Sequence, residues 1–356
     1  MTKLRLAVAG AGLIGRRHIE MIRNSRACEL SAIVDPSPQA VDYARELGVP
    51  VFGSLGELFA QDKPDGIVIA TPNQMHVDQG LECIAAGVPA LVEKPVADTL
   101  ERGVALLEAA ERARAKMLVG HHRRYSSIIA KAVEVIGAGA LGQIVAVVGT
   151  ALMYKAESEG YFDGEYAWRK GPGGGPILIN MVHEVGNLRA LVGEITEVQA
   201  FATSATRGFA VEDTAAINLR FANGALGTFM LSDTAATDRS WEHTSGEDKF
   251  RYSLAHTDQD DCYLVCGTWG SLAIPTMRLQ RYLKDEDRSW HKALDKITIS
   301  SEVVDPLSAQ IAHFCDVIRG HAEPWVSVRD GVQNLRVVDA IHEAARTGQI
   351  VRIGQG

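Results

Sequence analysis

The opening of the chain constrains the fold most: an apolar run from Leu4 leads into a glycine-rich turn that ends at Gly15. The glycines follow the pattern G-x-G-x-x-G, and apolar residues recur at helical spacing after them. A strand, a tight turn and a helix are therefore predicted. The N–H groups and dipole at the start of such a helix favour an anion, and the predicted pyrophosphate-binding residues are Gly10, Gly12, Leu13, Ile14 and Gly15. A turn without a ligand is the alternative, because glycines also serve close packing.

The composition narrows the classes of protein to which this chain can belong. Its 356 residues exceed the size of a single hydrophobic core, so two domains are expected. The net charge of -8 comes without a basic stripe, which argues against a nucleic-acid partner. No apolar run is long enough to cross a membrane and the first residues lack a signal-peptide pattern, so we expect a cytoplasmic protein without membrane contact.

The five cysteines are odd in number and scattered, as expected for reduced thiols in a reducing compartment. Cys262 and Cys266 lie four residues apart in a strand-like segment and would share one face. A metal-binding pair is the alternative there. Because no further Cys or His cluster lies nearby in the sequence, no metal site is predicted.

The first 120 residues alternate buried strands with amphipathic helices, the pattern of a doubly wound α/β fold with a parallel sheet. Strands are predicted at 4–9, 30–34, 50–52, 66–70, 89–92 and 117–119, and helices at 37–47, 54–60, 74–86 and 100–113. Ligands of such sheets bind at the carboxyl ends of the strands. The polar tips that follow the strands are therefore the predicted cofactor-binding residues, and they are Asp35, Thr71, Pro72, Asn73, His76, Glu93, Lys94 and Arg123.

Asp35 bears on the choice of cofactor. It ends the second predicted strand, twenty residues after Gly15, where a carboxylate would accept hydrogen bonds from the adenosine ribose and repel a 2'-phosphate. NAD is therefore favoured over NADP. The alternative is that Asp35 caps the next helix, which Pro36-Ser37-Pro38 would open.

From about residue 121 the hydrophobic period changes. Strands are predicted at 143–153, 197–203, 214–221, 225–231, 262–266, 271–274, 279–283 and 297–300, and helices at 126–136, 177–191 and from Asp305 and Arg329 onward. Asn223-Gly224 between two alternating runs predicts a hairpin, so the sheet is expected to be mostly antiparallel. The aromatic, charged and glycine-rich segment 154–174 is typical of an active-site loop. These patterns predict two domains, 1–120 and 121–356.

Several motifs in order resemble those of the glucose-fructose oxidoreductase/inositol dehydrogenase (Gfo/Idh/MocA) family. They are the glycine turn, Asp35, Thr-Pro-Asn with His76, Glu-Lys-Pro and Gly-x-x-Arg-Arg-Tyr, followed in the second half by Gly173-Gly174-Gly175, His183 and Glu212-Asp213-Thr214-Ala215. The resemblance implies a Rossmann domain, a carboxy-terminal α+β domain with a large open sheet, and a sugar, cyclitol or related diol as substrate. It also implies a homodimer or homotetramer formed through that sheet.

Lys94 is the first predicted catalytic residue. It directly follows a buried strand, where its ammonium could stabilise a developing alkoxide. The alternative is a surface ion pair with Glu93. In the family, the lysine of the matching Glu-Lys-Pro motif lies between nicotinamide and substrate, and the resemblance implies that role for Lys94.

His183 is the second predicted catalytic residue. A neutral imidazole can take a hydroxyl proton near neutral pH. A lone histidine in an apolar helix is more often a hydrogen-bonded core residue. The resemblance reverses that weighting, because the family's usual proton acceptor follows the triple glycine by eight residues, as His183 does.

The surroundings of this histidine depart from the family pattern. Sugar-oxidising members often have an aspartate four residues before it and another three residues after it, where this chain has Ile179 and Gly186. The Asp-His dyad is therefore absent. Either Glu184 or Asn180 compensates, or proton transfer depends more on Lys94 and solvent.

Polar and aromatic residues at loops and element ends are the predicted substrate contacts, although each also fits a packing or surface role. They are Lys94, His122, Arg123, Tyr161, Trp168, Asn180, His183 and Trp241. The acidic, aromatic segment from Trp241 to Tyr263 is predicted to be a specificity loop.

The leading hypothesis is an NAD-dependent dehydrogenase that acts on a secondary hydroxyl of a sugar or cyclitol. Two alternatives share every motif: a cis-dihydrodiol dehydrogenase and a glycosidase that uses a transient NAD redox cycle. An alternative of another class is a non-catalytic NAD-binding regulatory protein, for which only the missing aspartate argues.

Overall fold

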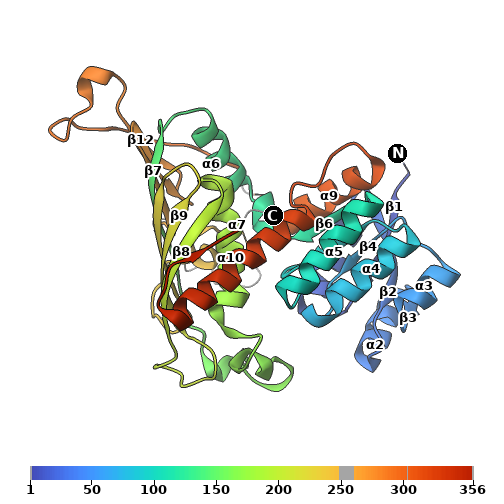
Figure 1. Ribbon diagram of the computed structural model, residues 1–356. Coiled ribbons are helices and arrows are strands. Elements are labelled where there is room, and N and C mark those ends of the chain that lie inside the picture. The colour runs from blue at the N-terminus through green and yellow to red at the C-terminus, as the bar shows by residue number, and fades with distance from the viewer. Residues whose placement is uncertain (1, 248–259, 303, 355–356) are drawn as a thin grey trace. The chain divides into compact units, whose positions relative to one another are not determined.

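The computed structural model describes residues 2–247, 260–302 and 304–354, and it divides into two compact units (Figure 1). One unit comprises Met1–Tyr125 and Pro306–Leu335, and the other comprises Ser126–Asp305 and Arg336–Gly356. We call them the Rossmann unit and the sheet unit.

The predicted division at residue 120 needs two corrections. The first segment of the Rossmann unit ends at Tyr125, and residues 306–335 belong to the same unit. Helix α9 (Pro306–Arg319) places Phe314 and Ile318 directly over Gly66, where a side chain larger than hydrogen would clash with them. Packing between segments far apart in the chain, which periodicity does not report, decides this assignment.

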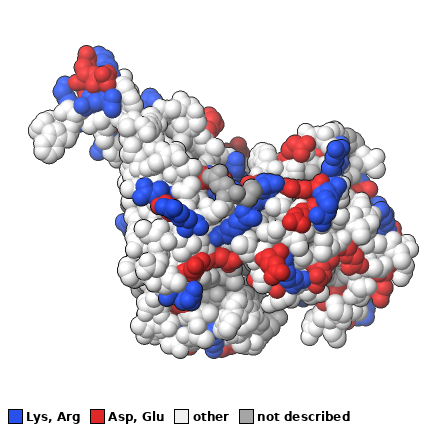
Figure 2. All heavy atoms as spheres, in the orientation of Figure 1, with Lys and Arg blue, Asp and Glu red and all other residues white. Residues whose placement is uncertain are grey.

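The Rossmann unit contains a six-stranded parallel sheet in the order β3-β2-β1-β4-β5-β6. This is the strand order of a doubly wound dinucleotide-binding fold, as predicted. The strands are β1 Leu4–Ala9, β2 Cys28–Val34, β3 Val51–Phe52, β4 Gly66–Ile69, β5 Ala90–Glu93 and β6 Met117–Gly120. The helices are α1 Leu13–Asn24, α2 Pro38–Leu47, α3 Leu55–Gln61, α4 His76–Ala86, α5 Leu100–Ala113 and α9, with short 3-10 turns at Asn73–Met75 and His122–Tyr125. Figure 2 shows acidic and basic side chains interspersed over the visible face of this unit.

Local chemistry explains where these helices begin and end. The side chains of Ser37, Ser54 and Thr99 each accept a hydrogen bond from the N–H three residues further on, which caps α2, α3 and α5. Gly48 and Gly87 end α2 and α4 in the left-handed conformation. These caps fix where the helices begin and end. Because the strands are parallel, the polar tips that follow them lie at one edge of the sheet.

The sheet unit contains a nine-stranded sheet in the order β14-β13-β12-β11-β7-β10-β9-β8-β15. Its strands are β7 Ile144–Leu152, β8 Ile195–Thr203, β9 Thr214–Phe221, β10 Leu226–Ser232, β11 Tyr263–Gly267, β12 Gly270–Ile274, β13 Arg278–Arg281, β14 Asp295–Thr298 and β15 Val351–Arg352. All neighbours pair antiparallel except β7 and β10, which pair parallel. The mostly antiparallel sheet is thus confirmed, whereas β15 is too short for a periodic signal.

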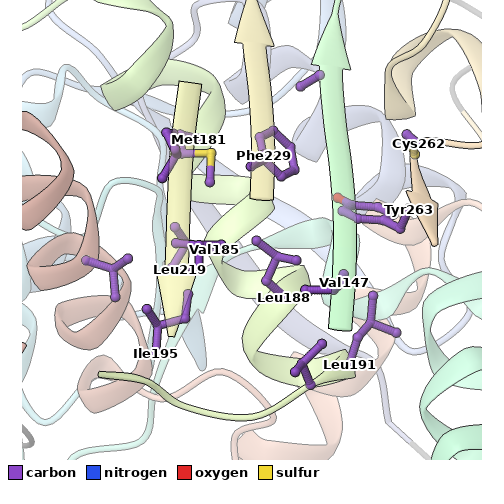
Figure 3. Close-up of a cluster of buried hydrophobic side chains, with 14 of the residues drawn as sticks. Val147, Met181, Val185, Leu188, Leu191, Ile195, Leu219, Phe229, Cys262 and Tyr263 are labelled. Carbon is purple, nitrogen blue, oxygen red and sulfur yellow. The ribbon is translucent and has the colours of Figure 1, made fainter. Parts of the chain in front are cut away.

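Helices cover one face of this sheet (Figure 1). They are α6 Ser127–Gly137, α7 Val182–Leu191 and the carboxy-terminal part of α10 Val328–Thr347, and a one-turn helix, α8, spans Trp241–Thr244. Figure 3 shows Val185, Leu188 and Leu191 of α7 packed toward strand residues that include Phe229 and Tyr263. Within the described residues, no helix is long and apolar enough to cross a membrane.

The structure divides the helix predicted at 177–191 into two parts. Ile177–Met181 forms a π-helix, and α7 follows directly from Val182. A π-helical turn changes the angular spacing of its side chains, and such turns occur frequently at functional sites. The predicted loop at 154–174 contains two 3-10 turns, Glu157–Glu159 and Gly164–Lys170.

Candidate functional site

The glycine turn has the geometry that a bound pyrophosphate requires. Gly10 has φ +88°, and a Cβ there would lie 2.6 Å from the carbonyl oxygen of Ala70. A Cβ on Gly15 would lie 1.9 Å from the carbonyl oxygen of Gly10, so α1 packs directly on the turn. At Gly12, the N-cap of α1, nothing lies within 4 Å of a Cβ position. Open space therefore faces the helix N-terminus, where an anion would accept hydrogen bonds from the first N–H groups.

Asp35 links this turn to the end of β2. One carboxylate oxygen accepts a hydrogen bond from the Ala11 N–H at 2.8 Å, and the other accepts one from the Ser37 N–H at 2.9 Å. Partial burial raises the pKa of Asp35, but these hydrogen bonds outweigh burial and hold the pKa below its ordinary value. The N-cap of α2 is Ser37, so the alternative that Asp35 caps this helix is wrong.

His76 joins two of the polar tips. Its ring is only 1% exposed, with Nδ1 2.8 Å from the carbonyl oxygen of Pro95 and Nε2 2.9 Å from that of Thr71. Burial holds the pKa of His76 below its ordinary value, so a neutral ring donates to one of the two carbonyls. Because each ring nitrogen of the buried His76 lies against one of these carbonyl oxygens, His76 positions the tips after β4 and β5. Pro72 and Asn73 remain at least partly exposed.

Glu93 forms a buried pair that the sequence analysis missed. It is 4% exposed, and its Oε1 lies 2.7 Å from Nε2 of His18, a fully buried residue of α1. Burial raises the pKa of Glu93, but the hydrogen bond and charge of His18 dominate and lower it to about 2. A buried Glu93 excludes the surface ion pair with Lys94 that the sequence left as an alternative.

Lys94 follows β5 at the ligand-binding edge of the sheet and is half-buried. Its backbone N–H donates to Oε2 of Glu93 at 3.1 Å, and the peptide bond to Pro95 is cis. The Lys94 backbone is therefore linked, through Glu93, to His18 of α1, the helix that follows the glycine turn.

The tip after β6 supplies Arg123, which is 4% exposed, and His122, which is half-buried. Just before them, Nε2 of His121 lies 3.2 Å from Nδ2 of Asn334 in α10. These residues are 213 positions apart, so no sequence pattern pointed to Asn334 as a residue that holds this tip.

In the sheet unit, His183 lies in the first turn of α7 and is 7% exposed. The segment that leads to it is held by Glu212, whose Oε1 accepts a hydrogen bond from the Ile177 N–H at 2.8 Å. Gly175 has φ +80°, and a Cβ there would lie 2.6 Å from the same oxygen. Burial raises the pKa of Glu212 above its ordinary value. The Gly-Gly-Gly and Glu-Asp-Thr motifs therefore meet at the start of the helix that bears His183.

The two candidates to replace the family's aspartate have other partners. Asn180 accepts a hydrogen bond from Nζ of Lys155 at 2.8 Å. Glu184 is 1% exposed and accepts a hydrogen bond from the Tyr263 hydroxyl, which in turn accepts one from Asn187 at 2.9 Å. The Glu184 carboxylate is thus part of a polar network in the core of the sheet unit.

The predicted aromatic contacts divide between surface and core. Tyr161 is half-buried and its hydroxyl lies 3.1 Å from Nζ of Lys155, while Trp168 is 46% exposed. Trp241 is 4% exposed and packs on Tyr263 with ring centroids 6.2 Å apart. Trp241 is therefore packed in the sheet unit, where its large apolar ring is stable, and its role as a substrate contact stays a prediction. Of the predicted specificity loop, residues 248–259 lie outside the described residues.

In residues 2–247, 260–302 and 304–354, no three His, Cys, Asp or Glu side chains are grouped so that they could hold a metal ion. Cys262 is buried, Cys266 is half-buried and both are free thiols.

A glycine turn at the carboxyl edge of a doubly wound sheet, followed by a unit with a large mixed sheet, defines a two-domain NAD-binding oxidoreductase. Residues 4–121 match the model described as oxidoreductase family, NAD-binding Rossmann fold, and residues 133–353 match that of the oxidoreductase family C-terminal alpha/beta domain. The chain belongs to the Gfo/Idh/MocA oxidoreductase family, which confirms the resemblance, the enzyme class and NAD as cofactor.

Named relatives support this assignment, one over almost the whole chain and one over about half of it. The 1,5-anhydro-D-fructose reductase of Ensifer adhaerens is 27% identical over 362 residues, which cover 99% of both proteins. The rhizopine catabolism protein MocA of Rhizobium meliloti is 28% identical over 214 residues, 58% of this chain and 62% of that protein. The WlbA dehydrogenase from Bordetella pertussis, solved in complex with NADH and UDP-GlcNAcA, aligns with TM-score 0.77 and 25% identity over 100% of both chains.

Proposed function

We propose that the protein is an NAD-dependent dehydrogenase that acts on a secondary hydroxyl of a sugar or cyclitol. One observation carries the proposal: Lys94 follows β5 at the sheet edge that bears the glycine turn, on a backbone tied to a buried carboxylate. The named relatives that act on sugars support the substrate class.

The residues of the Rossmann unit fit NAD. The open space at Gly12 and the first N–H groups of α1, at Leu13 and Ile14, would hold the pyrophosphate. Asp35, ionised near neutral pH, would accept hydrogen bonds from the ribose hydroxyls. The remaining candidates to line the site are Thr71, Pro72, Asn73 and Arg123. When bound, NAD supplies the hydride acceptor.

Two side chains would assist the removal of the hydroxyl proton. The ammonium of Lys94 would stabilise the negative charge that develops on the reacting oxygen. The imidazole of His183 would take the hydroxyl proton, and the cap on its helix by Glu212 would orient it. Each role is a proposal for this chain.

The test is a panel of neutral sugars, cyclitols, sugar acids and a cis-dihydrodiol, assayed for NADH formation. An aryl glycoside represents the glycosidase alternative and is assayed for release of the phenol, because a transient redox cycle leaves no net NADH. Lys94→Ala and His183→Ala should each lower kcat by about 10²-fold while NAD binding, measured by calorimetry, stays the same. Lys63→Ala, which removes an exposed lysine that donates to the Ala86 carbonyl, is the control. A near-normal kcat for His183→Ala would remove His183 from the mechanism.

Self-association through the sheet belongs to the same proposal. The sheet face that the helices leave uncovered bears an apolar row that shifts by two residues between β7 and β10. Leu264 pairs with Val148 on one side of the shift, and Met230, Ala216 and Phe201 pair in turn on the other, where Thr150 lies opposite Met230. Phe201 is 68% exposed, Val148 47%, Leu264 40% and Met230 39%. A contiguous apolar patch of this kind is typical of a protein–protein interface, so a homodimer or homotetramer would bury it.

The cytoplasmic location expected from the sequence stays a prediction. All five cysteines are free, and a reducing compartment would keep them so. Fractionation of cells that express the chain tests this location.

A further inference from the structure

His18 of α1 is a buried histidine with one polar contact among the described residues. Its side chain is fully buried, and its Nε2 lies 2.7 Å from Oε1 of Glu93. Its Nδ1 is also buried and has no hydrogen-bond partner in the described part of the chain. Burial of a polar nitrogen without a partner costs free energy that an apolar side chain of similar volume would not cost. The contact with Glu93 is therefore what a histidine contributes at this position.

The carboxylate of Glu93 is also enclosed by the neighbouring strand. Glu93 pairs with Gly120 in the parallel ladder of β5 and β6, and a Cβ on Gly120 would lie 2.8 Å from Oε1 of Glu93. Glycine at position 120 therefore leaves the room that the carboxylate occupies. Between His18 and Gly120, Oε1 of Glu93 is held in one place.

The other oxygen of the same carboxylate holds Lys94. Oε2 of Glu93 accepts a hydrogen bond from the Lys94 N–H at 3.1 Å, directly after the end of β5. A carboxylate is planar and rigid, so a rotation that displaces Oε1 also displaces Oε2. The hydrogen bond from His18 to Oε1 therefore fixes the oxygen that holds the Lys94 backbone.

The charges that face Glu93 favour its ionised form. Burial raises the pKa of Glu93, but the hydrogen bond and charge of His18, and then the charges of His122 and Lys94, lower it to about 2. An ionised carboxylate only accepts hydrogen bonds, so Nε2 of His18 and the N–H of Lys94 both donate to it. Hydrogen bonds to a charged acceptor are about twice as strong as those between neutral groups. The link from His18 to Lys94 is therefore made of two strong bonds.

We propose that His18 is a positioning residue for catalysis, which orients Lys94 through the Glu93 carboxylate. The proposal rests on the role of Lys94 in the proposed function and adds a residue that touches neither cofactor nor substrate. His18 lies on α1, whose first N–H groups would hold the pyrophosphate, so the helix that would bind the cofactor also fixes the lysine. Displacement of a catalytic group by about 1 Å can cost about 10²-fold in rate.

The experiment compares two amide side chains at position 18. His18→Gln can place an N–H donor where Nε2 lies, whereas the shorter side chain of His18→Asn ends near the place of Nδ1 and leaves Glu93 without this donor. His18→Asn should lower kcat about tenfold or more and leave the KM for NAD within about twofold, while His18→Gln should retain most of the kcat. Met21→Leu, which conserves the volume of another buried residue of α1, is the matched control and should leave kcat unchanged.

A double-mutant cycle tests whether His18 acts through Glu93. If it does, His18→Asn should lower kcat in the unaltered protein but cause no further loss in Glu93→Gln. Additive losses would overturn the inference, because His18 would then act independently of Glu93. Thermal unfolding of each variant sets an assay temperature at which all of them are folded.

Hydrogen exchange separates this inference from the proposed reaction, because it requires neither cofactor nor turnover. Exchange of the Lys94 N–H, followed by NMR of protein labelled with 15N-lysine and assigned with Lys94→Ala, should be about tenfold or more faster in His18→Asn than in His18→Gln. Faster exchange without turnover of any panel compound would support the link from His18 to Lys94 and contradict the proposed reaction. Unchanged exchange and kcat in His18→Asn, with Lys94→Ala inactive, would overturn the inference and leave the proposed reaction standing. An equal loss of kcat in Met21→Leu would also overturn the inference, because the packing of α1 would then explain the effect.

Discussion

At the scale of single residues, Asp35 and Glu93 show that a carboxylate at the end of a strand can have two different roles. Asp35 is partly exposed and accepts hydrogen bonds from two backbone N–H groups at the end of β2, as its proposed role toward the ribose requires. Glu93 is buried against His18 and accepts a hydrogen bond from the Lys94 N–H, so it acts through Lys94. Sequence position alone assigned both to the cofactor, because both follow a strand.

The first prediction concerns Asp35 and the choice of cofactor. Asp35→Asn removes the charge that repels a 2'-phosphate and one of the two acceptors, so the ratio of kcat/KM for NAD to that for NADP should fall about tenfold or more. Steady-state rates with both cofactors measure this ratio. Asp42→Asn, which removes an exposed carboxylate of α2, is the control. An unchanged ratio would refute the role given to Asp35.

The second prediction concerns acid stability and Glu93. Its folded-state pKa of about 2 lies below the ordinary value of 4.5, so its ionisation stabilises the fold above pH 4.5 and that stability is lost as the pH falls through about 2. This pKa shift contributes about 3 kcal/mol to the free energy of unfolding above pH 4.5. Glu93→Gln should lower the unfolding temperature near neutral pH and show a shallower decline between about pH 4.5 and pH 2. Thermal unfolding across that range measures it.

The control for this measurement is Asp62→Asn, which removes a largely exposed carboxylate paired with Arg5 in the same unit. Its unfolding temperature should decline with acid as the unaltered protein does, because exposed ion pairs contribute little to stability. Equal acid sensitivity of Glu93→Gln and the unaltered protein would show that the buried pair does not govern acid stability.

At the scale of elements, the segment before α7 decides where His183 lies. Glu212 on the approach to β9 caps a π-helical turn at Ile177, and Gly175 provides the space for the carboxylate. A helical hydrophobic pattern predicts that a helix is present, but it does not distinguish a π-helical first turn from an α-helical one.

The third prediction tests this cap with two glycines that are two positions apart. Gly175→Ala places a methyl group in contact with Glu212, whereas at Gly173, with φ +89°, nothing lies within 4 Å of a Cβ position. Both alanines suffer the strain of a positive φ, about 1 kcal/mol, but only Gly175→Ala should also displace the cap. We expect a lower unfolding temperature and about tenfold lower kcat for Gly175→Ala than for Gly173→Ala. Equal values for the two variants would exclude a role for the cap.

At the scale of the whole molecule, the main feature still to be explained is the face of the nine-stranded sheet that the helices leave uncovered. Antiparallel strands with one face on a core normally present polar residues on the other. Here Val148, Met230 and Phe201 interrupt that rule on three strands.

The fourth prediction follows from this face. Met230→Glu introduces a charge in the centre of the apolar row and should shift the protein to a smaller assembly, measured by size-exclusion chromatography with light scattering. Leu81→Glu alters an exposed apolar residue of α4 in the Rossmann unit and should leave the assembly unchanged. A monomeric unaltered protein, or an assembly that Met230→Glu does not affect, would contradict self-association through this face.

The sequence predicted most elements because the information it contains is local. Each strand of the Rossmann unit was predicted within two residues, since buried strands and the helices between them differ in period and in their capping residues. The candidate site was predicted in outline for the same reason, as polar residues that follow strands. The assignment that failed concerns distant packing: residues 306–335 joined the Rossmann unit. Nor did any local pattern show that Trp241 packs on Tyr263.

By itself, the sequence determined the glycine turn, the doubly wound parallel sheet that follows it and the family. Gly10 and Gly15 are required by backbone geometry within a few residues, so their pattern is readable without a fold. Only the tertiary structure decided that Glu93 pairs with His18 across 75 positions and that Lys155 binds Asn180 across 25. A hydrogen bond between distant residues depends on how whole elements pack, and neither period nor spacing records that.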